Sequence, residues 1–358
     1  MTLDDLIHRP QYSVPQAEKE AALLAELTRL GQSHRERSPE YARLVRVLFP
    51  GSANPRSLAE LPYLPVGLFK ERLLSSVPES EVFKILQSSG TSGQTPSRIV
   101  LDRETAQLQT LALGRIMTSV LGPNRLPMIL VETADLIRDR RQYNARAAGM
   151  LGMINFGRDH FYALDSNLEL RLPELKEFLR RFGGSTFLIF GFTFLVWTRF
   201  YQPLADAGLD LSHAILIHSG GWKKLQEQAV GAADFRAALR QTMGLTRVYN
   251  FYGMVEQVGS VFLEGDDGYL YPPNFADVIV RDPYTYEEVP DGQTGVIEVL
   301  SALPRSYPGH CILTEDLGVV HAVDASTCGR LGKAFSVLGR IPQAELRGCS
   351  DVVAAKVS

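Results

Sequence analysis

Cysteines and long apolar runs are scarce in this sequence, and each scarcity excludes a class of protein. The three cysteines, Cys311, Cys328 and Cys349, are an odd number without the spacing of metal ligands, so we expect neither a disulfide framework nor a zinc site. The longest run of aromatic and aliphatic residues, Phe187 to Trp197, is too short to cross a bilayer. Residues 1–12 lack the apolar centre of a signal peptide. The sequence therefore predicts a cytoplasmic protein without a membrane span.

A surplus of charge of one sign is lacking as well. The 37 lysines and arginines are interspersed with 40 aspartates and glutamates, which gives a formal net charge of −3. Such a balance predicts no basic patch for nucleic acid and no polybasic membrane anchor. With 358 residues, of which 45% are hydrophobic, the chain can bury the core of one large domain and a smaller one.

Helix signals dominate the first 60 residues. Ser13 and Gln16 have the spacing of a capping box, which predicts a helix that stops near Gly31. Ser38 followed by proline is typical of the start of a second helix. We expect these helices to pack and to carry no chemistry, so residues 1–60 are predicted to form an N-terminal helical segment.

Strand and helix patterns then alternate along the chain. Asp102 can cap an amphipathic helix, and the apolar stretch Met128 to Val131 follows it as a strand. Two further apolar strands are expected at 186–190 and 214–217, with helices between them. From Val258 onward short strands are separated by turns, which is typical of antiparallel pairing. The pattern predicts an α/β fold with mixed sheets flanked by helices and a β-rich C-terminal part.

Six small polar residues lie between the apolar segments 82–86 and 99–101, namely Ser88, Ser89, Gly90, Thr91, Ser92 and Gly93. Glycines let a phosphate oxygen approach the backbone, and the hydroxyls and N–H groups supply hydrogen-bond donors. The flanks indicate a loop between two strands, which differs from a Walker A loop that opens a helix. The stretch predicts a phosphate-binding loop, with a flexible linker as the alternative.

Two pairs of residues lie where predicted strands end. The strand 214–217 leads into a turn with Gly220 and Gly221, and open α/β sheets bind ligands at such strand ends, although a simple tight turn is an alternative. Asp316 follows an apolar step and could accept hydrogen bonds from both hydroxyls of a ribose, although a turn carboxylate is the commoner alternative. The guanidinium of Arg340 could pair with phosphate or ribose oxygens.

Another predicted strand is followed by an amide, an aromatic ring, a glycine and a carboxylate. These are Asn250, Tyr252, Gly253 and Glu256. A ring can stack on a base, an amide can bind its edge, and a carboxylate can hold a magnesium ion. A buried ring and a solvated glutamate are the ordinary alternatives. This segment gains weight only together with the other motifs.

In their order these motifs resemble the adenylate-forming superfamily of acyl-CoA ligases, peptide-synthetase adenylation domains and beetle luciferases. The likeness covers roughly residues 60–350. It implies an adenylation core over residues 61–340 that uses ATP and Mg²⁺. Four stretches are similar to the bacterial bioluminescence acyl-protein synthetases, the long-chain-fatty-acid–luciferin-component ligases: Ser88 to Gly93, His218 to Lys224, Tyr252 to Gln257 and Glu345 to Ser350.

The resemblance also implies a role for each motif residue. The implied contacts are Ser88 to Gly93 for the pyrophosphate end of ATP, Gly220 and Gly221 for the adenine pocket, Asn250, Tyr252 and Gly253 for the base, Asp316 for the ribose, Arg340 for ribose or phosphate, and Glu256 for Mg²⁺.

The sequence departs from the superfamily pattern in several places. The usual lysine after the loop is absent and Ser97 and Arg98 stand there, so we expect Arg98 to neutralise phosphate charge. Val255 replaces the hydroxyl residue that normally precedes the motif's glutamate, and the common Thr-Gly-Asp has a glutamate in place of its glycine. The superfamily's mobile C-terminal domain follows the Gly-Arg segment, whereas 18 residues follow Arg340 here. Residues 341–358 are therefore expected to form a short remnant.

We expect an ATP-dependent acid–thiol ligase that converts a carboxylic acid, favouring a fatty acid, into acyl-AMP. The acyl group is expected to pass to Cys349, which lies beside a flexible glycine and near Arg347, and then to a partner such as an acyl reductase or a carrier. Arg98 and Arg340 are the other expected catalytic residues. Two alternatives stay open: a ligase that delivers to coenzyme A or a carrier protein, and a non-catalytic nucleotide-binding partner.

Overall fold

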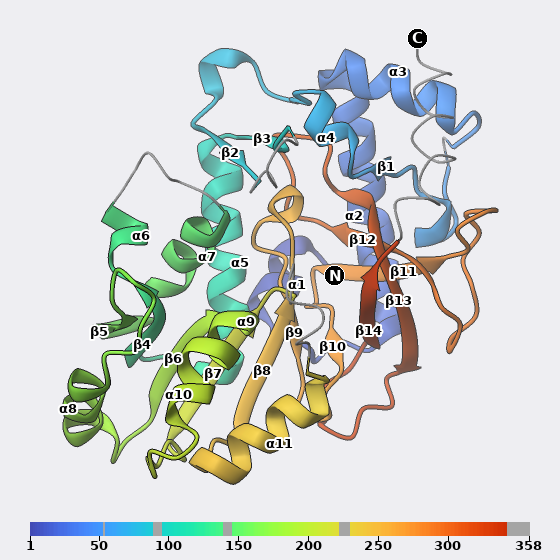
Figure 1. The fold of residues 1–358 in the computed structure, drawn as a ribbon. Helices are drawn as coiled ribbons and strands as arrows, with labels where there is room; N and C mark the ends of the chain where they lie inside the picture. Colours follow the sequence, from blue (N-terminus) through green and yellow to red (C-terminus); the bar gives the residue numbers. More distant parts are fainter. Residues whose placement is uncertain (53, 89–94, 139–144, 222–229, 342–358) are drawn as a thin grey trace. The chain divides into compact units, whose positions relative to one another are not determined.

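The chain divides into two units, each assembled from separate segments (Figure 1). The computed structural model describes residues 1–52, 54–88, 95–138, 145–221 and 230–341. The first unit comprises residues 1–116, 253–262 and 269–358, and the second comprises residues 117–252 and 263–268. The N-terminal helices therefore belong to the same unit as the C-terminal strands. The division of the chain at residues 60 and 340 stays a prediction.

The second unit is built on a parallel sheet with the strand order β5-β4-β6-β7-β8. Helices alternate with these strands along the chain, which confirms the predicted α/β pattern. The strands are β4 (Leu126–Thr133), β5 (Gly157–Leu164), β6 (Phe187–Phe192), β7 (Ala214–Ser219) and β8 (Arg247–Tyr252). The helices are α6 (Asp135–Arg138), α7 (Ala145–Ile154), α8 (Leu172–Phe182), α9 (Thr193–Leu195), the π-helix η4 (Val196–Tyr201), α10 (Gln202–Leu204) and α11 (Ala232–Met243).

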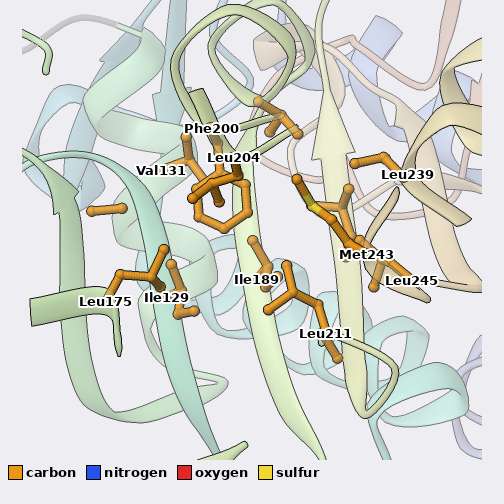
Figure 2. Packing of buried hydrophobic residues seen from close by; sticks show 14 of the residues in the cluster. Ile129, Val131, Leu175, Ile189, Phe200, Leu204, Leu211, Leu239, Met243 and Leu245 are labelled. Atoms are coloured by element: carbon orange, nitrogen blue, oxygen red, sulfur yellow. The ribbon is translucent and has the colours of Figure 1, made fainter. Parts of the chain in front are cut away.

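Strand register builds the core of the second unit. Ile129 on β4, Ile189 on β6 and Leu216 on β7 are direct neighbours in the sheet, and all three are at most 1% exposed. Because side chains alternate along a strand, these neighbours share one face. Phe200 and Leu204 pack in the same cluster (Figure 2). The result is a buried apolar layer of aliphatic and aromatic side chains in this unit.

Gly191 near the end of β6 has a steric role in this core. A Cβ atom there would lie 2.8 Å from Val131 Cβ and 2.8 Å from Val196 Cγ2, so no side chain fits. The flanking ring of Phe190 is fully buried, as is Phe187 at the start of the strand. These two aromatic residues are therefore core residues.

The first unit is β-rich and largely antiparallel, as the sequence predicted. Strands β11 to β14 pair in order, β10 pairs with β14, and β1 pairs with β13 in parallel. A separate hairpin joins β2 and β3. The bounds are β1 (Leu64–Pro65), β2 (Lys84–Gln87), β3 (Arg98–Leu101), β10 (Leu270–Tyr271), β11 (Ala276–Arg281), β12 (Gly295–Ser301), β13 (Cys311–Val323) and β14 (Lys333–Arg340), while β9 (Phe262–Glu264) has residues in both units.

The sequence predicted where some helices of the first unit begin and failed to predict it for others. Asp102 accepts a hydrogen bond from the Thr105 backbone N–H at 2.7 Å and caps the following helix, as predicted. The helices are α1 (Leu3–His8), α2 (Gln16–Arg37), α3 (Pro39–Leu48), α4 (Leu68–Glu71), the 3-10 helices η1 (Leu58–Glu60), η2 (Glu79–Glu81) and η6 (Val255–Gln257), and α5 (Arg103–Leu121), which begins in this unit.

The predicted bounds of α2 are wrong at both ends. Ser13 donates to the Pro10 carbonyl instead of capping the helix, and the Gln16 backbone N–H donates to the Asp324 carboxylate at 2.9 Å. The helix continues beyond Gly31 because that position lies against His310, where an added Cβ would be 3.4 Å from the ring Nε2. Contacts with residues far away in the sequence therefore determine the ends of this helix more strongly than the capping pattern and the glycine do.

A buried cluster of charges also fastens α2 to the strands. Lys19 Nζ lies 3.6 Å from Asp277 Oδ1, Lys333 Nζ lies 3.9 Å from the same oxygen, and Gln16 Nε2 donates to Asp277 Oδ2 at 2.6 Å. Burial alone would raise the pKa of Asp277, but the two ammonium groups and the Gln16 amide hold that pKa below its ordinary value. The carboxylate is thus an ionised anchor inside the first unit.

None of the helices in the described ranges is both long and apolar enough to cross a membrane.

Candidate active site

The predicted phosphate loop connects β2 to β3, which pair as a hairpin. The prediction of a loop between two strands is therefore confirmed. The Ser88 N–H donates to the Ser97 carbonyl at 3.0 Å, and the Ser97 N–H donates to Ser88 Oγ at 2.8 Å. These two bonds close the hairpin at the base of the loop. Ser88 is therefore held by its hydroxyl, while residues 89–94, which include Ser89, Gly90, Thr91, Ser92 and Gly93, lie outside the described residues.

Glu256 lies in η6 of the same unit and is 6% exposed. Its backbone carbonyl accepts from Tyr307 Oη at 2.8 Å, and the next residue, Gln257, donates from Nε2 to the Val299 and Gly309 carbonyls. These buried bonds fix the turn that carries the carboxylate. Gly253, predicted to contact the base, lies just before this turn and is exposed.

The electrostatic surroundings of Glu256 combine burial with nearby donors. Burial raises the pKa of this carboxyl above its ordinary value, and the Ser97 hydroxyl and the Lys70 charge oppose that rise. Ser97 Oγ is buried and makes no hydrogen bond within 3.5 Å in the described ranges, although it is close enough to favour the ionised carboxylate. Glu256 is thus a partly desolvated carboxylate beside the base of the loop.

The donor set fits Mg²⁺ better than a transition metal. No group of three or more histidine, cysteine, aspartate or glutamate residues within the described ranges could hold a metal ion. Magnesium in nucleotide sites needs only one or two carboxylates, because phosphate oxygens and water complete its coordination. A single buried glutamate near the base of the predicted phosphate loop meets that requirement.

Arg98 begins β3, next to Ser97, and pairs in register with Gln87. Its Nε is buried and has no hydrogen-bond partner in the part of the chain that the structure describes. A buried guanidinium donor without a partner costs free energy unless a ligand satisfies it. This fits the expectation that Arg98 contacts an anion.

Asp316 and Arg340 are direct neighbours across β13 and β14. Arg340 Nε lies 3.7 Å from Asp316 Oδ1, and the Asp316 N–H donates to Thr314 Oγ1 at 3.1 Å. The Arg340 side chain is 73% exposed and that of Asp316 is 19% exposed. Strand pairing therefore brings these two predicted residues together, with the cation turned to solvent and the carboxylate half-buried.

The remaining predicted residues lie in the second unit, at the ends of β7 and β8. His218 pairs in register with Asn250, and Ser219 with Phe251, so Gly220 and Gly221 follow beside Tyr252. Gly220 has a φ of +82°, which a residue with a side chain rarely adopts. The two glycines thus follow the strand residue that pairs with Phe251, and their role in an adenine pocket stays a prediction.

Asn250 has an unmet hydrogen-bonding capacity. Its backbone N–H donates to Glu264 Oε2 at 2.9 Å, and Glu264 is fixed by Arg236 Nη1 at 2.9 Å. Its side-chain Oδ1 is buried and accepts no hydrogen bond from any described residue. The exocyclic amino group of adenine is a donor that would satisfy this oxygen.

His218 is a structural residue. Its Nδ1 lies 2.9 Å from Thr193 Oγ1, and burial followed by the charge of Arg236 lowers its pKa to about 3. A ring that stays neutral and enclosed is a poor proton carrier near pH 7. The buried ring of His218 therefore joins the end of β7 to Thr193 at the start of α9.

Sequence reasoning missed one charged residue beside this site. Lys70 in α4 acts electrostatically on Glu256, and its Nζ lies 3.9 Å from Glu315 Oε2. It precedes the loop by many positions, and only the pairing of β1 with β13 carries α4 toward residues 314–316. No local motif signals such a residue.

The predicted residues fall into two sets. Ser88, Arg98, Gly253, Glu256, Asp316 and Arg340 belong to the first unit, and Gly220, Gly221, Asn250 and Tyr252 belong to the second. Cys349 lies outside the described residues. A hollow of about 560 Å³ in the first unit is lined by other residues, among them Phe49, Tyr63 and Arg281, and by none of the predicted ones.

The fold is that of the large domain of adenylate-forming ligases. The structure is similar to 2-hydroxyisobutyryl-CoA ligase, solved in an open conformation with 2-HIB-AMP and CoA, with a TM-score of 0.70 and 20% identity over 94% of this chain and 77% of that protein. The chain belongs to the LuxE acyl-protein synthetase family, whose sequence profile matches residues 12–358. It is therefore a ligase of that family.

Two relatives carry the same name, long-chain-fatty-acid–luciferin-component ligase. The protein of Vibrio harveyi is 24% identical over 338 residues, which cover 89% of this chain and 84% of that protein. The protein of Aliivibrio fischeri is 24% identical over 284 residues, which cover 76% of this chain and 72% of that protein.

Proposed function

We propose that this protein activates a fatty acid with ATP as an acyl-adenylate and then transfers the acyl group to its own Cys349. The observation that carries the proposal is the arrangement in the first unit, where the closed base of the Ser/Gly loop lies beside a buried carboxylate. Membership of an acyl-protein synthetase family supports the same chemistry. The names of the relatives support a long-chain fatty acid as the substrate.

In the first half-reaction a carboxylate oxygen of the acid bonds to the α-phosphorus of ATP, and the bond from that phosphorus to the bridging oxygen breaks. Pyrophosphate leaves with the electron pair. Two anions must meet and the leaving group must be stabilised, so positioning and charge neutralisation provide most of the rate enhancement. Arg98 and the backbone of the loop would supply donors to the phosphates.

Glu256 would hold Mg²⁺, which when bound supplies further charge neutralisation at the phosphates. Asp316 would accept hydrogen bonds from the ribose hydroxyls, with Arg340 opposite it on the neighbouring strand. In the second unit, the unsatisfied Oδ1 of Asn250 would accept from the adenine amino group, and the ring of Tyr252 would lie against the base.

In the second half-reaction the Cys349 thiolate attacks the acyl carbonyl, a thioester bond forms, and AMP leaves with the electron pair of the broken C–O bond. The thiol proton passes to solvent. The thioester then supplies acyl groups to a partner protein such as an acyl reductase or a carrier. Arg347 precedes Cys349 by two positions in the sequence, and a cation close to the thiol would favour the thiolate.

The test is to incubate the purified protein with ATP, Mg²⁺ and fatty acids of increasing chain length. We expect acid-dependent exchange of pyrophosphate into ATP and the gain of one hydroxylamine-labile acyl mass per chain. Cys349→Ser should still make acyl-AMP and gain no acyl mass, whereas Cys328→Ser is the matched control and should be acylated.

Three results would contradict parts of the proposal. Acylation that persists in Cys349→Ser would remove this cysteine as the acceptor. Exchange with rapid acyl transfer to coenzyme A and none to protein would support a coenzyme A ligase instead. ATP binding without exchange for any acid would indicate a non-catalytic nucleotide-binding protein.

A further inference from the structure

The cluster around Glu256 contains a lysine that no motif indicates. Strand β3 lies next to both α4, which carries Lys70, and η6, which carries Glu256, and Lys70 Nζ lies 3.9 Å from Glu315 Oε2. The three side chains belong to the first unit and come from η6, α4 and β13. Lys70 therefore lies on an element next to the strand that begins with Arg98 at the base of the Ser/Gly loop.

Strand pairing fixes where Lys70 lies. Leu64 and Pro65 pair in parallel with Ile312 and Leu313, and the Val66 N–H extends this ladder by donating to the Leu313 carbonyl at 2.9 Å. The short helix α4 follows at once, so its side chains reach the residues after Leu313. Lys70 is thereby held next to the Thr-Glu-Asp segment without being part of it.

The contact of Lys70 with Glu315 is loose. At 3.9 Å between Nζ and Oε2, the pair makes no hydrogen bond, and both side chains are about one-third exposed, at 31% and 30%. Arg72, in the same segment, instead binds Glu40 tightly at 2.6 Å. An exposed and loosely held ion pair contributes little to stability, so its ammonium can turn to another anion at small cost.

We propose that Lys70 binds the polyphosphate of ATP beside Glu256 and takes the place of the lysine that is missing after the Ser/Gly loop. This inference rests on the proposed function. A flexible ammonium carries three donors and acts on phosphate as a point charge, so it need not approach from one fixed position in the sequence. Glu315 holds the ammonium near the site in the absence of nucleotide and competes with phosphate for it.

The competition predicts opposite effects of two substitutions. Lys70→Met should weaken the affinity for ATP and for inorganic pyrophosphate about 10- to 100-fold, the range of one charge-assisted contact, and leave the affinity for adenosine unchanged. Glu315→Gln should tighten ATP and pyrophosphate, because it removes a negative charge near the phosphates. Lys70→Arg should retain most of the affinity.

The measurement is isothermal titration of the whole protein with ATP, pyrophosphate and adenosine, in the presence and absence of Mg²⁺ and at two salt concentrations. The matched control is Lys84→Met, which removes an exposed lysine of β2 in the same unit. Thermal melting of each variant reports folding. The advantage of wild type over Lys70→Met should shrink at high salt, because salt screens an exposed charge.

The outcomes separate this inference from the function on which it rests. Wild type that binds ATP, with unchanged ATP affinity in Lys70→Met, would overturn only the role of Lys70. Equal losses for ATP and adenosine in that variant would also overturn it, because they indicate a damaged site. Folded wild type that binds neither ATP nor pyrophosphate would overturn the proposed function and the inference together.

Discussion

Acidification should destabilise the first unit through a histidine in its core. His34 of α2 is fully buried and stacks on His310 with ring centroids 5.0 Å apart. Its Nε2 lies 3.1 Å from the Pro304 carbonyl and its Nδ1 lies 2.7 Å from Ser76 Oγ. A carbonyl only accepts, so Nε2 carries the proton and Nδ1 accepts from the serine hydroxyl. Protonation would reverse this second bond and place a charge against a neighbouring ring.

Burial, with a smaller contribution from the charge of Arg37, lowers the pKa of His34 from 6.5 to about 4. Because this native pKa lies below the unfolded one, the unfolded chain binds more protons between pH 6.5 and 4. The contribution of His34 to the free energy of unfolding is therefore complete above pH 6.5. It falls as the pH is lowered through this window and changes no further below pH 4. At 1.36 kcal/mol per pH unit, His34 alone accounts for about 2 kcal/mol by pH 5 and about 3 kcal/mol below pH 4.

The assay is urea unfolding followed by circular dichroism from pH 7.5 to pH 5 at constant ionic strength. His34→Gln should be less stable than wild type at pH 7.5 but should lose less stability on acidification. His321→Gln, which changes an exposed histidine of β13, is the control and should keep the wild-type dependence on pH. Identical pH dependence in wild type and His34→Gln would refute the assignment of this loss to His34.

Three other predictions concern the site and its support. Glu256→Ala and Asp316→Ala should abolish most acid-dependent pyrophosphate exchange while their melting temperatures stay near that of wild type, and wild-type exchange rates would remove both residues from the site. Arg98→Ala should weaken ATP binding by roughly 1.5–3 kcal/mol, measured by titration, because a charged donor to phosphate is lost, and an unchanged affinity would contradict this. Gly259→Ala should destabilise the protein by about 1–3 kcal/mol in urea unfolding, since its φ is +88° and its Cβ would lie 2.8 Å from the Gln109 carbonyl oxygen; wild-type stability would show that this turn can shift.

Local signals predicted those parts of the fold that local contacts determine. The cap at Asp102 depends on a residue three positions away, and the strands on either side of the Ser/Gly loop pair with each other. The order of apolar segments likewise predicted the α/β pattern and the antiparallel C-terminal strands. The pairing of Asp316 with Arg340 follows from two neighbouring strands in that antiparallel part.

Long-range contacts determine what the sequence did not show. The start of α2 depends on Asp324, which is 308 positions away from Gln16. The capping pattern at Ser13 therefore predicted the wrong first residue of this helix. Lys70 reaches the site only through the pairing of Leu64 with Ile312. The orphaned Oδ1 of Asn250 is likewise a property of burial and cannot be recognised in the residue type. The roles of Asn250, Glu256 and Asp316 toward a nucleotide stay predictions.

The buried cluster of Lys19, Asp277 and Lys333 has a consequence for the order of events on the ribosome. Gln16 and Asp277 are 261 positions apart, so the partners of α2 emerge from the ribosome long after α2 itself. The second unit is complete by residue 268, which lets a later segment of the chain fold before the first one. Until then α2 exposes its apolar side chains and remains open to chaperones. Hydrogen exchange of ribosome-bound chains stalled soon after residue 268 has emerged should show this order, with amides of β6 and β7 protected and those of α2 unprotected.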